Sequence, residues 1–489
     1  MIAMRLAFRG IGLASTLILV RFLSPADFGL VGFVTIAYSV LDQLSDLSSG
    51  VALIRMKTPE RSHYDTAWTL GVLRGLLTGV LFALAAPLLA AFIQEPRVEP
   101  ISYVIALLAV IQGFENIGMA DLQRELHFNR VFWCGFASKV VGFCSCVPAA
   151  FILRSYWALV IGFAGTRLAS VVLSYLVSSY RPRFGLKAWR DLLTFSKWMV
   201  LVNIQKLIDS YSMVFVVGRM GGPSAIGNYQ VAYQIGALPP TEIAAPARQP
   251  LYAGYSRAGG DTDRLRLQFL EGLSLMLCLV MPASVGIVLL AKSMTFIFLG
   301  KQWLDVAPVV GLCALYALFD SIAHFCEPVF FALHRERSYV HTFTIVLAVR
   351  MPGILIGTYL CGLEGAVLSL VASAFFNLLL WLRALRPLIG VTSRNVLGSI
   401  WRTMLATCGM MCAVWWTAER WPFSYEIVGA GFRFTSLSLI GGAVQFVGQY
   451  SLWLASAKPA GPEATLLNLV VGALRRAHRL LGRARSAFA

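Results

Sequence analysis

The sequence predicts an all-α integral membrane protein with about 14 transmembrane helices. Hydrophobic residues make up 58% of the 489 positions and charged residues only 13%, whereas about a quarter of the residues in an average soluble protein are charged. The mean hydropathy is +0.71. Apolar runs of about 20 residues, the length that one spanning helix needs, recur from the first residues to about Ala457. No segment is long and polar enough to form a soluble domain.

The first apolar run begins around two arginines, Arg5 and Arg9, and so has the look of a signal peptide. Another apolar run follows within a few residues, so we expect a retained first helix. Only Gly10 to Val20 is uninterrupted, which leaves open a start upstream of Met1 or an Arg9 that faces the protein interior. The predicted spans lie near residues 3–20, 29–53, 67–93, 101–120, 131–153, 156–179, 195–218, 227–253, 267–291, 304–332, 339–360, 364–386, 398–418 and 428–455.

Basic residues collect in every second loop between these spans. With a cytoplasmic N-terminus, the inside loops are the basic ones and the outside loops hold few lysines or arginines. The positive-inside rule therefore places both termini in the cytoplasm, which fits a bacterial inner membrane. The inside groups are Arg55, Lys57 and Arg61; Arg124 and Arg130; Arg181, Arg183, Lys187 and Arg190; Arg257, Arg264 and Arg266; Arg335 and Arg337; and Arg383, Arg386 and Arg394.

The net charge of +17 does not indicate nucleic acid, because the basic residues stand in short groups rather than on one continuous stripe. Anionic membrane lipids explain them better. Most of the nine cysteines fall inside apolar runs, where a thiol behaves as a small hydrophobe. We therefore expect no disulfide framework, no metal site and no cofactor; coupling to Na⁺ or H⁺ stays open.

The chain contains an internal repeat. The pattern Arg-x₃-Pro-x₃-Gly occurs at residues 21–29 and again at 219–227, each time in the first outside loop of a six-helix block. Leu-Gln-Arg-Glu at 122–125 resembles Leu-His-Arg-Glu at 333–336. Equivalent loops on the same side indicate parallel repeats about an axis along the membrane normal. We expect an N-terminal six-helix lobe at 1–180, a second at 181–390, two additional helices at 391–457 and a basic tail at 458–489. The tail is either an amphipathic helix on the cytoplasmic leaflet or a disordered segment.

Several motifs together resemble one family. They are RFLSPADFG at 21–29, SDL at 45–47 leading to GVALIR at 50–55, LQREL at 122–126, YWALVIG at 156–162 and YRPR at 180–183. These residues resemble the polysaccharide transporter (oligosaccharide flippase) branch of the multidrug, oligosaccharidyl-lipid and polysaccharide exporter superfamily. The resemblance implies alternating access by two lobes and no enzymatic activity. It also implies undecaprenyl-diphosphate-linked oligosaccharide units as cargo, for surface polysaccharide, exopolysaccharide or lipopolysaccharide, with polymerase and co-polymerase proteins as partners.

Charged residues recur inside the predicted spans, where each costs about 2.5–3.5 kcal/mol on insertion scales. Such residues normally face a wet cavity or an ionic partner. A diphosphate in a dry cavity needs cationic donors, and the candidates for substrate binding are Arg9, Asp46, Arg74, Lys139, Arg167, Lys206, Asp209 and Arg350. The alternative for each is an ion pair that locks two helices together.

Two further features of the spans bear on mechanism. Asp320, His324 and Glu327 share one helix face, which suits a proton relay or a weak metal site, or simply an ionic lock. Four prolines in the eighth span, at 239, 240, 246 and 250, should break that helix and provide either a gating hinge or a static kink. No Gly-x₄-Gly-Lys phosphate loop is present, so we expect no ATP hydrolysis.

Two other functions compete with oligosaccharide export. A multidrug exporter of the same superfamily should have a mainly acidic and aromatic cavity, which the intramembrane arginines and lysines disfavour. A membrane glycan polymerase or ligase generally needs a large outside loop for its catalytic groups, and every outside loop predicted here is short.

Overall fold

The computed structural model describes residues 2–45, 59–189, 197–244, 261–423, 425–457 and 461–464, with positions 53, 56, 251, 254 and 255; side chains at 2–7, 9 and 197–200 are not described. These residues form helices and no strand. The helices are α1 Ile2–Leu19, α2 Pro25–Leu44, α4 Arg61–Ile93, α5 Val98–Gly113, α6 Gly118–Arg124, α7 Phe128–Leu153, α8 Trp157–Val177, α10 Lys197–Gly236, α12 Thr262–Met294, α13 Ala307–Ala332, α14 Glu336–Ile389, α15 Ser393–Arg420 and α16 Ile427–Ala455. Short turns η1 Pro240–Ala244, η3 Thr295–Leu299 and η4 Lys301–Val306 connect them.

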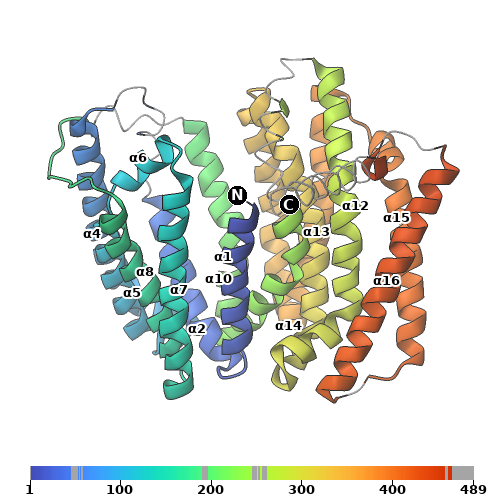
Figure 1. Cartoon of the computed structure of the whole chain (residues 1–489), viewed down its shortest axis with the longest axis horizontal. Helices are drawn as coiled ribbons and strands as arrows, with labels where there is room; N and C mark the ends of the chain where they lie inside the picture. Colours follow the sequence, from blue (N-terminus) through green and yellow to red (C-terminus); the bar gives the residue numbers. More distant parts are fainter. Residues whose placement is uncertain are drawn as a thin grey trace, which may run out of the picture. The chain divides into compact units, whose positions relative to one another are not determined.

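The helices group into two compact units. The first comprises residues Met1–Val231 and Met351–Ala366, and the second Ala232–Arg350 and Val367–Ala489. In the first unit α4 packs on α5 and α7 on α8, and in the second α12 packs on both α13 and α15, while α15 packs on α16. These long helices run alongside one another within each unit (Figure 1). The lobe boundaries expected at 180 and 390 stay a prediction.

The lengths and compositions of the helices confirm an all-α membrane protein. Among the described residues, nine helices are long and apolar enough to cross a membrane, or ten if the bent pair α5 and α6 counts as one span. α14 contains two expected spans, because the backbone leaves helical geometry at Cys361 and Gly362. α10 contains most of the seventh span and the start of the eighth, which are separated by non-helical geometry at Gly222. The described helices are therefore consistent with the fourteen predicted spans.

The fourth span differs from the prediction of one helix over 101–120. α5 ends at Gly113, and α6 then departs at an angle of 61°. Asn116 explains the break, because its side-chain amide donates to the carbonyl of Tyr180 at 2.8 Å and its backbone N–H donates to Ser174 at 3.0 Å. These bonds replace helical ones.

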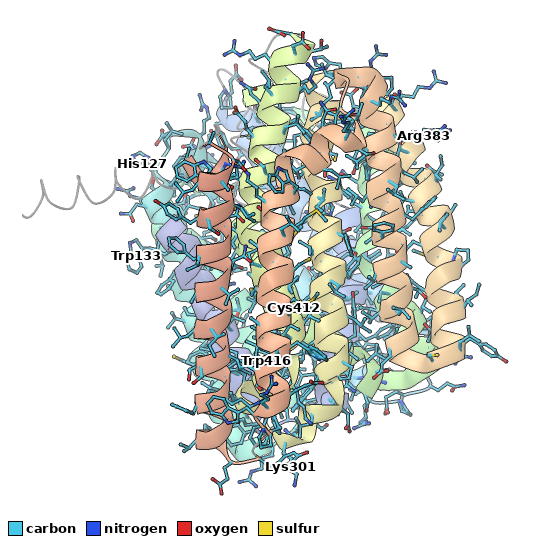
Figure 2. The ribbon with its side chains drawn as sticks, turned by 90° about the vertical axis from the view of Figure 1, so that its right-hand side faces the viewer. His127, Trp133, Lys301, Arg383, Cys412 and Trp416 are labelled. Atoms are coloured by element: carbon cyan, nitrogen blue, oxygen red, sulfur yellow. The ribbon has the colours of Figure 1, made fainter. Side chains whose placement is uncertain are left out.

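Large apolar side chains cover the outer faces of α15 and α16, as expected for helices in contact with lipid. In α16 the exposed residues include Val428, Leu439 and Phe446. Trp415 and Trp416 lie near the end of α15, and an aromatic pair there suits the membrane interface. Figure 2 shows Trp416 on this helix, and it shows Arg383 and Lys301 at opposite ends of the second unit.

Small residues allow the helices of the first unit to approach closely. A Cβ added at Gly75 in α4 would lie 2.7 Å from the Cα of Gly113 in α5, and one at Gly142 in α7 would lie 2.9 Å from the carbonyl oxygen of Gly162 in α8. Close backbone contact through glycine is a common way to associate helices in lipid, where hydrophobic burial provides no driving force.

The two copies of the repeated motif begin helical segments in the same way. Ser24 caps α2 in a capping box with Asp27, and Pro25 takes the first helical position. In the second copy, Gly222 breaks α10 with a φ of +71°, which favours glycine, and Pro223 follows directly. The repeat found in the sequence therefore corresponds to two equivalent helix starts.

These two helix starts contact each other reciprocally. A Cβ at Gly29 would overlap the carbonyl oxygen of Pro223, and a Cβ at Gly227 would overlap the carbonyl oxygen of Pro25. The missing side chain of each glycine thus leaves space for the proline carbonyl of the other copy. This arrangement is what a local two-fold relation between the repeats would produce.

The prolines of the eighth span lie where the helix stops. α10 ends at Gly236 and is followed by the π-helical turn η1, which begins at Pro240. Pro246 and Pro250 lie outside the described residues, as does the tail 458–489 apart from 461–464. The expected break is thus present at Pro240, and the amphipathic tail stays a prediction.

Replacing Gly29 with alanine should destabilise the first unit by about 1–3 kcal/mol, because an overlapping methyl forces the crossing helices apart. Gly398→Ala is the matched control, since Gly398 is an exposed helical glycine with no atom within 4 Å of the added Cβ. The measurement is thermal unfolding of the full chain in detergent. Equal unfolding temperatures for the two variants would show that the contact between Gly29 and Pro223 has room for a methyl group.

Candidate functional site

Arg74 in α4 is held by the C-terminal end of α2. Its guanidinium Nη2 lies 2.5 Å from Asp42 Oδ1 and donates to the carbonyl of Asp42 at 3.0 Å, while Nε donates to Ser45 at 3.3 Å. The Arg74 side chain is still 26% exposed and that of Asp42 36%. The pair is therefore positioned by two helices and remains accessible.

Arg167 in α8 belongs to a neighbouring network with α5. Its Nη1 donates to the side-chain oxygen of Gln112 at 3.4 Å, and its guanidinium lies 5.0 Å from the centre of the Phe163 ring. Glu115 accepts from Gln112 and from Ser170.

Tyr38 in α2 connects the two networks, because it lies within electrostatic range of Asp42, Arg74 and Arg167. Two of the predicted cationic residues thus come together in the first unit. A partly exposed guanidinium with hydroxyl or amide neighbours can bind an anion such as a phosphate.

The remaining predicted residues of the first unit are placed less closely. Lys206 and Asp209 lie one turn apart on α10, and both are half-buried. Lys139 is exposed, with its ammonium 5.0 Å from the centre of the Phe8 ring. The side chain of Arg9 and all of Asp46 lie outside the described residues.

Arg350 has a different environment in the second unit. Its side chain is 0% exposed, and its Nη2 lies 3.5 Å from Asp320 Oδ1. It also donates to the Tyr316 hydroxyl at 3.4 Å. Here α13 and α14 are held together by a buried ion pair.

The three residues predicted on one face of α13 also interact with one another. His324 Nε2 lies 3.1 Å from Asp320, and its Nδ1 lies 3.7 Å from Glu327. Within the described ranges, no group of three His, Cys, Asp or Glu side chains is arranged to hold a metal ion. The cluster therefore offers a histidine between two carboxylates, which is a chain of proton-binding groups.

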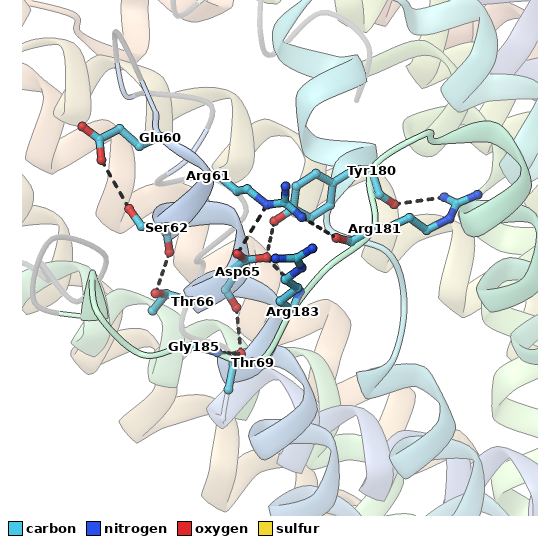
Figure 3. A network of polar contacts seen from close by, with 10 residues as sticks. All are labelled: Glu60, Arg61, Ser62, Asp65, Thr66, Thr69, Tyr180, Arg181, Arg183 and Gly185. Atoms are coloured by element: carbon cyan, nitrogen blue, oxygen red, sulfur yellow. Dashed lines mark hydrogen bonds and ion pairs between the residues drawn. The ribbon is translucent and has the colours of Figure 1, made fainter.

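A polar network anchors the segment after α8 to the start of α4. Asp65 accepts from the Tyr180 hydroxyl at 2.5 Å and from the Arg183 backbone N–H at 2.8 Å, and Arg61 lies 3.8 Å away (Figure 3). Burial and the Asp65 carboxylate both raise the pKa of Tyr180. A hollow of about 570 Å³ next to this network is lined by Pro59, Arg61, Tyr64, Asp121, Arg124, Ser179, Tyr180 and Arg181. Its arginines can attract anionic headgroups.

A long apolar groove of about 700 Å³ runs between α12, α15 and α16 in the second unit. Its walls are mainly aliphatic and aromatic, but Gln445, Gln449 and Glu463 also line it. The apolar residues are Cys278, Leu279, Pro282, Ala283, Gly286, Ile287, Leu290, Met294, Met410, Val414, Phe434, Leu437, Gly441, Gly442, Phe446, Tyr450 and Trp453. A groove of this composition suits a hydrocarbon chain.

Sequence reasoning did not identify this groove or the ion pair of Arg402 with Glu463, whose atoms lie 3.4 Å apart. One signal was available, because Arg402 is a charged residue inside the predicted span 398–418. The partner Glu463 follows the last span and gave no such signal.

Comparisons with known proteins agree on the class of protein. A family model described as polysaccharide biosynthesis protein matches residues 18–308, and one described as lipid II flippase MurJ matches residues 254–430. The chain is 23% identical over 397 residues to the lipopolysaccharide biosynthesis protein WzxC of Escherichia coli (strain K12), covering 80% of this chain and 81% of that protein. It is 24% identical over 309 residues to the succinoglycan biosynthesis transport protein ExoT of Rhizobium meliloti (strain 1021), covering 63% and 62% of the two chains.

Solved structures with a similar fold include the lipid II flippase MurJ in an inward closed conformation. The TM-score is 0.76 at 15% identity, with 94% of this chain and 100% of that chain covered. An inward-facing multidrug resistance MATE family transporter of the MOP superfamily has a TM-score of 0.59 at 14% identity, with 77% and 94% covered. At these identities the likeness shows the fold alone.

Replacing Asp320 with asparagine should destabilise the second unit by about 3–5 kcal/mol, because it removes a charge partner of the fully buried Arg350. The double variant Asp320→Asn/Arg350→Met removes both charges and should recover much of that loss. Lys301→Gln, at an exposed lysine of the same unit, is the control. Thermal unfolding of the full chain compares the three variants. A double variant less stable than Asp320→Asn would contradict the paired arrangement.

Proposed function

This chain belongs to the polysaccharide biosynthesis protein family, and from that membership we propose that it moves lipid-linked oligosaccharide units across the membrane. The cargo is an oligosaccharide repeat unit on undecaprenyl diphosphate. It enters from the cytoplasmic leaflet and leaves on the opposite side, where it serves the synthesis of surface polysaccharide, exopolysaccharide or lipopolysaccharide. The name of WzxC supports a role in polysaccharide biosynthesis, and the name of ExoT supports transport for such a pathway.

The observation that carries this proposal is the presence of accessible arginines on helices long and apolar enough to span a membrane. Arg74 and Arg167 lie within range of the same tyrosine, Tyr38, on helices of hydrocarbon length. A diphosphate that leaves water needs such donors to replace its lost hydration. A protein that only packs its helices together would gain little from keeping Arg74 partly exposed.

The apolar groove supplies the second part that this cargo requires. A lipid-linked sugar has a polar headgroup and a long hydrocarbon chain, and the two need different environments. The groove of α12, α15 and α16 has mainly apolar walls, so it can hold the chain.

The predicted site residues divide into two groups in this proposal. Arg74, Arg167, Lys206 and Asp209 contact the cargo headgroup, together with Lys139, Arg9 and Asp46. Arg350 instead locks α13 to α14, because its side chain has no exposed surface and lies 3.5 Å from Asp320.

Transport proceeds by alternating access without ATP. No phosphate-binding loop occurs in the sequence. The membrane potential, negative inside, favours outward movement of an anion by about 2.3 kcal/mol per charge per 100 mV. Consumption of the cargo by a polymerase on the outer side also favours export.

The inner membrane is the proposed location, with both termini in the cytoplasm. The alternation of basic loops supports this orientation. Polymerase and co-polymerase proteins are the proposed partners, since they would use the exported units.

Two other functions fit less well. A multidrug exporter shares the fold, as the MATE likeness shows, but the arginines around Tyr38 disfavour a cationic drug. A glycan polymerase or ligase needs a catalytic loop outside the membrane. Described connections on the expected outer side, such as those from Gln94 to Arg97 and from Arg154 to Tyr156, are short.

Deleting the protein should cause completed lipid-linked repeat units to accumulate in the cytoplasmic leaflet, because assembly continues while export stops. The measurement is extraction of lipid-linked glycans, with leaflet assignment by a membrane-impermeant glycan-modifying reagent. Accumulation on the outer face would instead indicate a polymerase or ligase. Increased drug sensitivity without glycan accumulation would indicate a multidrug exporter.

Replacing Arg74 with alanine should lower polysaccharide export at least tenfold at a normal protein level, because one lost charged hydrogen bond costs about 1.5–3 kcal/mol. Lys206→Ala should act in the same direction. Asp42→Asn separates this role from a structural one, since it breaks the same ion pair but keeps the cation. It should lower export less than Arg74→Ala does, because cargo binding is kept and only release is slowed. Arg97→Ala, at an exposed arginine paired with Glu95, is the neutral control. Equal losses in Arg74→Ala and Asp42→Asn would assign Arg74 a structural role.

A further inference from the structure

The apolar groove of the second unit ends in a buried polar cluster. Gln449 donates to Glu463 at 2.7 Å and lies 3.2 Å from the Thr403 hydroxyl. Arg402 Nη2 lies 3.4 Å from Glu463, and the two side chains are only 8% and 7% exposed. The cluster joins a residue near the start of α15 to one near the end of α16.

Several polar atoms of this cluster have no hydrogen-bond partner among the described residues. They are Arg402 Nη1, Gln449 Oε1, Glu463 Oε2 and both amide atoms of Gln445. Gln445 and Gln449 stand one turn apart on α16, and both line the groove. Buried polar groups are normally satisfied. Unused hydrogen-bonding groups at the end of a groove therefore indicate a ligand that is bound only part of the time.

The existing pair of Arg402 and Glu463 is incomplete. A guanidinium offers five N–H donors in a planar fork, which suits two oxygens of one anion. Glu463 contacts this guanidinium only through its Oε2, which lies 3.4 Å from Nη2 and accepts no hydrogen bond in the described structure. A phosphate in its place can engage the guanidinium in a bidentate manner and can also accept from Gln445 or Gln449.

We propose that Arg402, Gln445 and Gln449 bind the phosphate of a polyisoprenyl phosphate lipid whose chain lies in the groove, and that Glu463 occupies the phosphate position when no lipid is bound. This inference rests on the proposed function and adds a second phosphate site, separate from Arg74 and Arg167. Glu463 acts as an exchangeable latch.

The positions of the residues along the chain support this exchange. Arg402 and Gln449 are fixed on long helices, whereas Glu463 lies beyond the end of α16. Glu463 can therefore leave without moving a transmembrane helix. The positive-inside expectation places the start of α15 and the end of α16 on the cytoplasmic side, where the cargo is made.

The shape of the groove favours one hydrocarbon chain with one anionic end. Its walls come from three helices, and its polar lining consists of Ser438, Gln445, Gln449 and Glu463. A polyisoprenyl phosphate has this form. A phospholipid has two chains and a glycerol unit between chain and phosphate. Free phosphate has no hydrocarbon part that could pack against the apolar walls.

Binding measurements on the purified full chain in neutral-lipid nanodiscs test the proposal. The probes are a polyisoprenyl monophosphate, the polyisoprenol of equal length, phosphatidylglycerol and inorganic phosphate. The wild-type chain should prefer the monophosphate over the alcohol by about tenfold or more, as expected for a charged hydrogen bond. Phosphatidylglycerol and inorganic phosphate should compete weakly.

Variants of the two charged residues should change binding in opposite directions. Arg402→Gln should abolish the preference for the monophosphate and leave the affinity for the alcohol unchanged. Glu463→Gln should raise the affinity for the monophosphate, because the competing carboxylate is gone. Arg394→Gln, at an exposed arginine on the same end of α15, should behave as wild type. If Arg402→Gln does not fold, Arg402→Met/Glu463→Met removes both charges of the buried pair and should lose the preference.

Three results would overturn the inference. Equal affinity of the wild-type chain for the monophosphate and the alcohol would remove the phosphate site. Weaker monophosphate binding by Glu463→Gln would make the pair purely structural. Equal competition by phosphatidylglycerol or inorganic phosphate would remove the polyisoprenyl assignment. If the deletion strain still accumulates lipid-linked units inside, any of these results contradicts the phosphate site without contradicting export.

Discussion

A charged side chain in hydrocarbon has no water to bond, so each one must find partners within the protein. This constraint accounts for the polar architecture of the chain. Arg74 is held by the end of α2, Arg167 by a glutamine of α5, and Arg350 by an aspartate and a tyrosine of α13. The exposure of these groups differs, and that difference separates arginines that can reach a ligand from one that holds helices together.

The backbone obeys a related constraint. Helices in lipid cannot rely on hydrophobic burial, so they associate through close contact of small residues. Glycines at the α4–α5 and α7–α8 contacts serve this purpose, and the reciprocal contact of Gly29 and Gly227 applies it to the repeated motif. The motif therefore serves two purposes: its proline begins a helical segment, and its glycine leaves space for the proline carbonyl of the other copy.

Local sequence patterns predicted the fold well, because spans depend on residues close together in the chain. A break between the spans 339–360 and 364–386 was predicted, and the helical geometry of α14 does fail there, at Cys361 and Gly362. The break after Gly113 was not predicted, since the bonds of Asn116 go to Ser174 and Tyr180, far along the chain. The charged residues of the candidate site were predicted individually, but their ionic partners were not. Arg74 was predicted as a candidate, but its contact with Asp42 depends on how α2 packs on α4. The contact of Glu463 with Arg402 could not be predicted, because nothing in the sequence around a carboxylate outside the spans indicates that it pairs with a buried arginine.

The carboxylate partners explain how a transporter of anions can also release them. An unpaired arginine in a membrane would bind a phosphate so strongly that release would restore a bare buried charge. An arginine that already has a carboxylate nearby exchanges one anion for another, and its charge stays compensated before and after the exchange. Asp42 stands in this relation to Arg74, and Glu463 to Arg402. The net preference for cargo then depends on the difference between two similar interactions, which keeps both loading and release accessible. Asp320 makes no such exchange possible for Arg350, because a pair with no exposed arginine surface offers an incoming anion no approach.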